Sequence, residues 1–234
     1  MGENVALPAA GQQSMAANTL MTGQVVVGAC DKGSPEREAL EQFISSIFSA
    51  SYGAKILEYL PLLFSLMDGK HHTAALGVGS AAAAPLFCEQ YLDTAVEDQV
   101  MTLYSQRVGR RDIMELGNLV STTSGQSALL YLLVAAALDE ACVGYLLFAA
   151  NRAVRASIRR SGFTPKIIHV ADSRRLGVEA ANWGSYYEGE PIVMLADIAL
   201  TIEQARCQPV MCKLLDSYSH AIPVLADAIR KLRP

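Results

Sequence analysis

The residues of this chain best placed to do chemistry lie in one short stretch, ELGNLVSTTSGQS, which runs from Glu115 to Ser127. Its second half, from Thr122 onward, consists of small hydroxyl residues around Gly125, and an apolar run follows. Such a turn lets successive backbone N–H groups point outward, and the start of a following helix adds partial positive charge. The stretch therefore predicts a site for a phosphate or another anion.

Gly117 interrupts an otherwise apolar strand just before that turn. A glycine inside a strand marks a bulge, the close approach of a ligand, or packing against a large neighbour, and the sequence leaves these alternatives open. A ligand lying along a bulged strand would place its anionic end on the turn, which suits the pantetheine arm of an acyl thioester. The candidate donor-binding residues are Gly117, Asn118, Leu119, Val120, Thr122, Thr123, Ser124, Gly125, Gln126, Ser127 and Asn151.

Glu115 is the first candidate for proton transfer. Side chains two positions apart share one face of a strand, so Glu115 shares a face with Gly117. A partly buried carboxylate with a raised pKa could accept a proton from an attacking amine, and an ion pair with a nearby arginine is the alternative role. Glu89 is the competing carboxylate. Tyr186 or Tyr187 is the candidate proton donor to a leaving thiolate, although aromatic packing is expected for at least one of them.

Two periodicities in the sequence predict the elements that position these residues. Short apolar or β-branched stretches predict strands at 24–30, 58–67, 73–81, 111–121, 144–149, 166–171 and 191–198. Helical spacing of apolar residues predicts helices at 34–50, 94–106, 128–141 and 151–161, then two helical stretches beyond Ala199, the second broken at Pro223. Strands that alternate with helices after an initial hairpin predict an α/β fold with a mixed central sheet and helices on both faces.

The composition narrows the class of protein. The 234 residues carry a formal net charge of −4, which argues against a nucleic-acid binder. The five cysteines are odd in number and scattered, which fits a reducing cytoplasm better than a disulfide framework. We expect residues 1–22 to be poorly ordered. The longest apolar stretch, 129–138, is too short to span a bilayer, so a cytoplasmic protein without an integral membrane segment is expected.

Four motifs in fixed order resemble the thermostable hemolysin family: APLFCEQYLD from residue 84, ELGNLVSTTSGQ from 115, FAANRAVRASIRRSGF from 148 and WGSYYEGEPIVMLADI from 183. The resemblance extends from about Val25 to Ile198. That family resembles the Gcn5-related N-acetyltransferase (GNAT) superfamily. Its Glu-x-x-Asn strand, here Glu115 to Asn118, is also similar to the Glu-x-x-Arg strand of N-acyl-homoserine-lactone and N-acyl-amino-acid synthases. The resemblance implies a GNAT-like acyltransferase domain at residues 23–198 and a helical extension at 199–234.

One departure from the GNAT pattern concerns the anion loop. The pattern Gln/Arg-x-x-Gly-x-Gly/Ala reads here Thr122-x-x-Gly125-x-Ser127, so the first basic or amide side chain is missing. Coenzyme A presents a diphosphate and a ribose phosphate, whereas an acyl-carrier protein presents a single phosphodiester. A weaker anion loop therefore favours an acyl-carrier protein or a long-chain acyl-CoA over acetyl-CoA as the donor.

These features predict an enzyme that moves an acyl group from acyl-CoA or acyl-carrier protein to the amine of an amino acid or small molecule, in specialised metabolism. The thioester is a co-substrate, and no permanently bound cofactor or metal is expected. Two other classes stay open: a membrane-perturbing effector of the hemolysin type, and a non-catalytic thioester-binding component of a pathway. The apolar positions of residues 210–232 fit packing on the chain's own sheet, a homodimer contact or a membrane surface.

Overall fold

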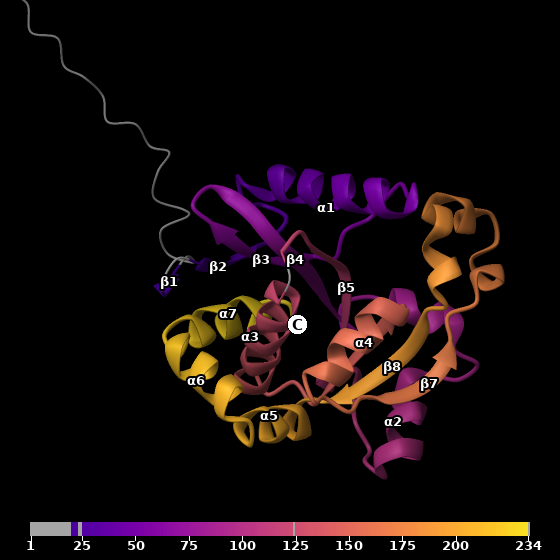
Figure 1. Cartoon of the computed structure of the whole chain (residues 1–234). Coiled ribbons are helices and arrows are strands. Elements are labelled where there is room, and N and C mark those ends of the chain that lie inside the picture. The colour runs from indigo at the N-terminus through magenta and orange to yellow at the C-terminus, as the bar shows by residue number, and fades with distance from the viewer. Residues whose placement is uncertain (1–19, 23–24, 124, 234) are drawn as a thin grey trace, which may run out of the picture.

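The computed structural model describes residues 20–22, 25–123 and 125–233, which form an eight-stranded mixed sheet (Figure 1). The strand order is β1-β2-β3-β4-β5-β6-β8-β7, and β5 and β6 are the parallel pair. The strands are β1 (Leu20–Thr22), β2 (Val25–Cys30), β3 (Leu62–Asp68), β4 (His71–Ser80), β5 (Ile113–Ser121), β6 (Tyr145–Ala150), β7 (Lys166–Val170) and β8 (Ile192–Asp197). The predicted α/β class is confirmed. We predicted that residues 1–22 are poorly ordered. Residues 1–19 of that range lie outside the described residues, and residues 20–22 form β1.

Helices cover both faces of the sheet, as predicted (Figure 1). One face carries α1 (Arg37–Tyr52), α2 (Val96–Tyr104) and the 3₁₀ segments η1 (Phe87–Tyr91) and η3 (Ser173–Gly189), while η2 (Arg110–Asp112) leads into β5. The other face carries α3 (Gln126–Glu140) and α4 (Arg152–Arg160). The side chains of β5 alternate between the two cores: Met114 and Leu116 pack with α3, and Ile113 packs with α2.

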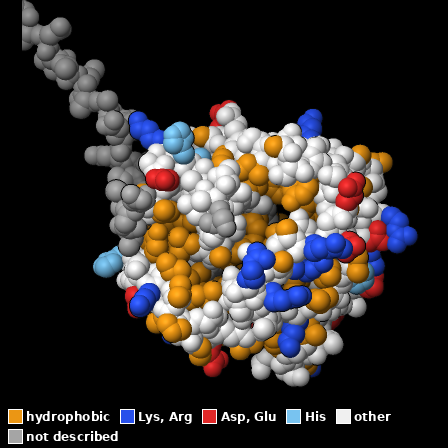
Figure 2. Space-filling model, in the orientation of Figure 1, with side chains coloured by type: hydrophobic (Ala, Val, Ile, Leu, Met, Phe, Trp, Pro, Cys, Tyr) orange, Lys and Arg blue, Asp and Glu red, His pale blue; other side chains and the backbone are white. Residues whose placement is uncertain are grey.

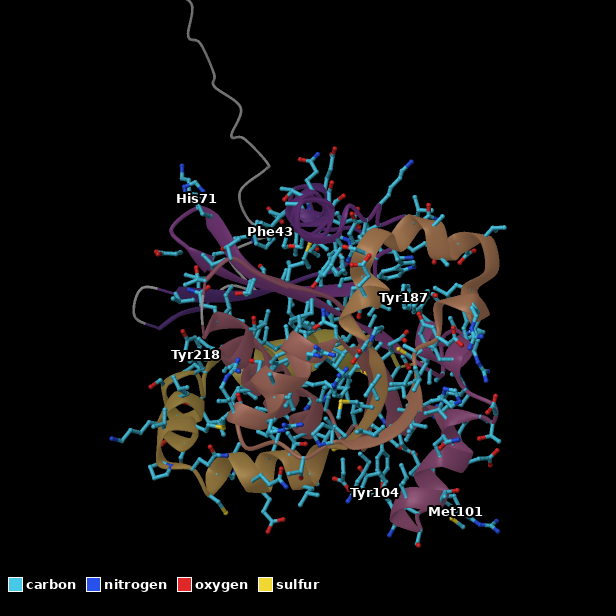
Figure 3. All side chains as sticks on the ribbon, turned by 45° about the vertical axis from the view of Figure 1, so that its right-hand side comes forward. Phe43, His71, Met101, Tyr104, Tyr187 and Tyr218 are labelled. Carbon is cyan, nitrogen blue, oxygen red and sulfur yellow. The ribbon has the colours of Figure 1, made fainter. Side chains whose placement is uncertain are left out.

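The C-terminal extension packs on α3 and forms three helices, α5 (Ile198–Arg206), α6 (Pro209–Ser217) and α7 (Ala221–Arg230). Leu225 and Ile229 of α7 are buried in the same core as α3 and the sheet. Tyr218, labelled in Figure 3, donates a hydrogen bond to the carbonyl of Val25 on β2 (3.4 Å). The predicted break at Pro223 is wrong, because this proline lies in the first turn of α7, where a helix has no use for the missing N–H.

Arg37 fixes the segment that connects α1 to β3. Its side chain is buried and donates to the carbonyls of Cys30 (3.3 Å), Leu60 (2.8 Å) and Pro61 (3.2 Å), and to the carboxylate of Glu41 (2.6 Å). A buried cation needs such partners to replace water. The segment therefore stays outside the sheet, and β3 begins at Leu62 instead of the predicted residue 58.

Candidate active site

The parallel strands β5 and β6 separate at their carboxyl ends. Backbone pairing joins residues 113–116 of β5 to residues 145–148 of β6. Beyond these residues the two strands are not paired in the described part of the chain, although β5 extends to Ser121 and β6 to Ala150. The register with β4 shifts opposite Gly117–Val120, and Asn118 has a left-handed backbone (φ 52°), so β5 contains a β-bulge. An extended ligand can lie between two strands that separate in this way. Figure 2 shows a recess beside β5, between α1 and the helices α3 and α4.

The predicted anion loop connects β5 to α3 at the edge of this recess. The backbone N–H of Thr122 donates to the carbonyl of Thr73 (2.9 Å). The Ser121 hydroxyl donates to the carbonyl of Thr123 (2.8 Å). Gly125 starts α3 in a left-handed conformation (φ 84°), and a Cβ added there would meet nothing within 4 Å. Ser124 lies outside the described residues.

The start of α3 has no side-chain cap among the described residues, unlike the starts of α4 and α5. Asn151 caps α4 by accepting from Val154 (3.0 Å), and Asp197 caps α5 by accepting from Leu200 (3.0 Å). The first turn of α3 therefore keeps N–H groups that an external anion can use. The Oε1 atom of Gln126 in that turn is also buried without a hydrogen-bond partner in the described part of the chain.

Leu60 accounts for the glycine in the strand. A Cβ on Gly117 would lie 3.1 Å from Cδ1 of Leu60, and a Cβ on Gly77 of β4 would lie 2.9 Å from Cβ of Leu60. The side chain of Asn118 accepts a hydrogen bond from the backbone N–H of Leu60 (2.9 Å). Of the alternatives for Gly117, packing against a large neighbour therefore applies, and the neighbour is Leu60. Leu119 is half-buried with the α3 core, and Val120 is buried against α1.

Glu115 holds the start of η1. Its Oε2 accepts from the N–H of Phe87 (2.8 Å) and its Oε1 from the N–H of Cys88 (2.6 Å). The residue is 3% exposed, and burial raises the pKa of its carboxyl despite these hydrogen bonds. Its partners are backbone amides 27 and 28 residues away, so no local pattern of residue types predicts this contact.

Glu89, the competing carboxylate, forms an ion pair within the same region. Both its oxygens lie 2.8 Å from the guanidinium of Arg110, and Oε2 also accepts from the N–H of Leu86 (2.8 Å). The hydrogen bonds from Arg110 are the main reason that the pKa of Glu89 is lowered. Glu89 therefore stays charged and engaged with Arg110.

Seven aromatic rings from α1, η1 and η3 lie together on the face of the sheet opposite α3. Neighbouring ring centroids are 5.3 to 6.4 Å apart. Trp183 packs with both apolar cores on this face. Of these rings, only the tyrosine pair of η3 was predicted as a source of a proton. Trp183 lies in the same segment, whereas the other four rings come from α1 and η1. We call this group the aromatic cluster; its members are Phe48, Tyr52, Phe87, Tyr91, Trp183, Tyr186 and Tyr187.

Two hydrogen bonds orient the phenols of the aromatic cluster. The hydroxyls of Tyr91 and Tyr187 are 2.5 Å apart, and Asn151 donates from Nδ2 to the hydroxyl of Tyr52 (3.0 Å). Burial raises the pKa values of both Tyr91 and Tyr187, and either hydroxyl can donate in the hydrogen bond that joins them. Tyr187, labelled in Figure 3, is half-buried, whereas Tyr91 is fully buried. Burial likewise raises the pKa of Tyr186.

The family model described as thermostable hemolysin matches residues 30–202. The chain belongs to the thermostable hemolysin family. The resemblance predicted from the four motifs is therefore confirmed for this family. No curated protein matches the sequence. No helix of the described residues is long and apolar enough to cross a membrane, and in the same ranges no cluster of Cys, His, Asp and Glu is arranged to hold a metal ion.

Solved structures show which fold this member of the family has. FeeM, an N-acyl amino acid synthase from uncultured soil microbes, is similar at 16% identity with a TM-score of 0.52, covering 76% of this chain and 93% of FeeM. TofI in an apo form is similar at 15% identity with a TM-score of 0.52, covering 80% of this chain and 99% of TofI. TofI in a ternary complex with an inhibitor and MTA gives 14% identity, a TM-score of 0.50 and the same coverage. The predicted acyl-CoA N-acyltransferase-like (GNAT-like) fold is confirmed.

Proposed function

We propose that this thermostable hemolysin family member transfers an acyl group from a thioester to an amine. The observation that carries the proposal is the separation of β5 from β6 beside the uncapped start of α3. In this proposal the pantetheine arm lies between the two strands. Its phosphate accepts hydrogen bonds from N–H groups of the 122–127 loop other than those of Thr122 and Gln126, which already donate to the carbonyls of Thr73 and Thr123. The fold shared with FeeM supports the same reaction class.

The proposed reaction needs one proton acceptor and one proton donor. The amine nitrogen attacks the thioester carbonyl, the C–N bond forms, and the C–S bond breaks with the electron pair leaving on sulfur. Glu115 takes the amine proton directly or through a water, because each of its oxygens has a lone pair left beyond its amide hydrogen bond. Most of the rate gain comes from holding the amine against the carbonyl carbon.

Tyr187 is the stronger of the two candidate donors to the thiolate. A phenolate left on Tyr187 would accept a hydrogen bond from the hydroxyl of Tyr91, 2.5 Å away, which stabilises the charge. The hydroxyl of Tyr186 makes no hydrogen bond to any described residue. Tyr186 stays the second candidate, and Glu89 is less suited to proton transfer because Arg110 holds it as a carboxylate.

The donor we propose is an acyl-carrier protein or a long-chain acyl-CoA. Arginines of α4 flank the recess, and Figure 2 shows these cationic side chains gathered over α4. Arg159 and Arg160 are exposed, whereas Arg152 pairs with Glu190 (2.7 Å). This local positive charge on a chain of net charge −4 supports an anionic donor.

Thiol release in the presence of defined donors and amines tests the proposal. The protein is incubated with acyl-CoAs of several lengths, or with acyl-carrier protein, and a panel of primary amines; the amide product is detected by mass spectrometry. We expect thiol release that depends on the amine. Binding of the thioester without amine-dependent release would instead favour the non-catalytic pathway component. Glu115→Gln is the active-site variant, and Glu203→Gln on the exposed surface of α5 is its matched control.

A further inference from the structure

We infer that this protein has a second binding site, which takes an amphipathic amine: a molecule with an apolar body and a protonated nitrogen. The site is a pocket of 390 Å³ between α3, α5, α6 and α7. It is lined by the C-terminal half of α3, whereas the proposed donor loop lies at the start of that helix. This second site does not depend on the proposed transferase function.

The floor of the pocket is apolar and comes from four helices. Ala136 of α3 and Ile202 of α5 are buried, and Leu215 of α6 and Ile222 of α7 are half-buried against them. Figure 1 shows α5, α6 and α7 arranged around one side of α3. The volume lies within the range of small-molecule sites, roughly 300–1,000 Å³. The apolar body of a ligand can therefore cover this floor and exclude water from it.

The rim of the pocket carries more negative than positive charge. Asp139 and Glu140 of α3 and Asp216 of α6 line it, together with Arg206 of α5. Glu140 lies 3.8 Å from the guanidinium of Arg230. The carboxylates of Asp139 and Asp216, and the guanidinium of Arg206, form no ion pair with any described residue. Three carboxylates beside one lining guanidinium favour a cationic ligand.

The three acids also occupy helix ends that do not suit them. Asp139 and Glu140 lie in the last turn of α3 and Asp216 in the last turn of α6, and neither turn holds a basic residue. The C-terminal end of a helix carries partial negative charge, which favours cations and disfavours carboxylates. Arg206, by contrast, lies in the last turn of α5, where the helix itself favours it. A protonated amine at the rim would relieve the unfavourable charge at both helix ends.

Such a conflict between local preference and fold is what a functional site produces. The same rim selects against anions, because a carboxylate or phosphate would meet the three acids and the negative ends of two helices. The anionic thioester donor is therefore not a ligand for this pocket. An uncharged apolar molecule could cover the floor, but it would leave the charge at the rim uncompensated.

Three probes with the same alkyl chain test the inference: octylamine, 1-octanol and octanoate. Their affinities for the full chain are measured at pH 7 by calorimetry, and backbone ¹⁵N–¹H shifts locate where each probe binds. We expect octylamine to bind about 10-fold more tightly than 1-octanol, because partly exposed ion pairs each contribute modestly, and octanoate to bind most weakly. The largest shift changes with octylamine should occur at residues 136–140, 202–206 and 212–216.

Removal of two rim charges tests the role of the acids. Asp139→Asn combined with Asp216→Asn should weaken octylamine binding about 10-fold and leave 1-octanol binding unchanged. Without ligand, the same variant should have a higher urea midpoint than the wild type, because two carboxylates leave the C-terminal ends of helices. Glu38→Gln combined with Asp98→Asn is the control: it removes two exposed charges from α1 and α2, on the other face of the sheet, and should leave octylamine binding unchanged.

Leu215→Trp tests the pocket without altering its charge. The larger side chain occupies the floor, so octylamine and 1-octanol should both bind at least 10-fold more weakly. Equal binding of octylamine and 1-octanol, unchanged binding to Leu215→Trp, or shift changes only in the recess beside β5 would each overturn the inference. A lower urea midpoint for the Asp139 and Asp216 variant would refute the unfavourable placement of the acids. None of these results bears on thiol release, which tests the transferase function separately.

Discussion

Replacement of Glu115 by glutamine is the perturbation whose consequences the structure defines best. The carboxylate gives one oxygen to each of two backbone amides, at 2.8 and 2.6 Å, and glutamine has only one oxygen to give. The variant therefore loses one hydrogen bond to a charged group and places an NH₂ against a backbone N–H. Each of these effects costs about 1–3 kcal/mol, and relief from burying a charge offsets part of the sum. We expect Glu115→Gln to be less stable by about 1–3 kcal/mol.

The pH dependence of the stability difference between the wild type and Glu115→Gln shows whether burial or hydrogen bonding dominates the pKa of Glu115. Burial raises the pKa of Glu115 above its ordinary 4.5, so the folded protein binds this proton more tightly than the unfolded chain does. Its contribution to stability is therefore full below pH 4.5 and decreases as the pH rises through the folded-state pKa. The unfolding free energy of the wild type minus that of Glu115→Gln should fall with rising pH in that window.

Urea denaturation of both proteins between pH 4 and 8 measures this difference. Other titrating groups are common to the two proteins and cancel when their free energies are subtracted. Glu89→Gln provides the comparison, because hydrogen bonds from Arg110 lower the pKa of Glu89 and its difference should rise with pH instead. A difference for Glu115 that rises with pH would mean that the two amides outweigh burial, and the assignment of a raised pKa would be refuted.

Three further predictions concern activity and packing. Tyr187→Phe should lower kcat of amine-dependent thiol release by about 10- to 100-fold, and Tyr186→Phe less, because of the two only Tyr187 lies within hydrogen-bond distance of the Tyr91 hydroxyl. Equal losses measured by steady-state kinetics would contradict this. Gly77→Val should destabilise the fold by about 1–3 kcal/mol in urea denaturation, since its Cβ would lie 2.9 Å from side-chain atoms of Leu60 and Leu63, and a neutral effect would show that Leu60 moves away freely. Leu225→Ala should cost about 2–5 kcal/mol by calorimetry or urea denaturation, because α7 is buried in the core with α3; a cost near zero would show that the C-terminal extension is dispensable.

Periodicity predicted most elements of the sheet because each strand and helix has its own local pattern. The strand predicted at 111–121 is observed at 113–121, and the helix predicted at 128–141 is observed at 126–140. The segment before β3 was placed wrongly because its position depends on Arg37, whose partners lie 7 to 24 residues away. Pro223 was interpreted as a break because the sequence did not show that α7 begins only two residues earlier.

The site was predictable only where its residues are adjacent in the chain. The turn at 122–127 and the special position of Gly117 are visible in a single stretch of sequence. The hydrogen bonds that Glu115 accepts from η1, and the pairing of Tyr91 with Tyr187, join residues 27 to 96 positions apart. No local pattern reports contacts of that range, so the aromatic cluster emerged only from the fold.

Backbone amide shifts during titration with a non-hydrolysable acyl-CoA analogue test the central claim most directly. If the thioester arm lies between β5 and β6, the largest ¹⁵N–¹H shift changes should occur at Gly117–Val120 and at the start of α3, around Gly125–Ser127. The separate 390 Å³ pocket between α3, α5, α6 and α7, lined by Ala136, Ile202 and Leu215, serves as the internal comparison. Shift changes confined to that pocket, with the β5 and α3 amides unmoved, would contradict the account.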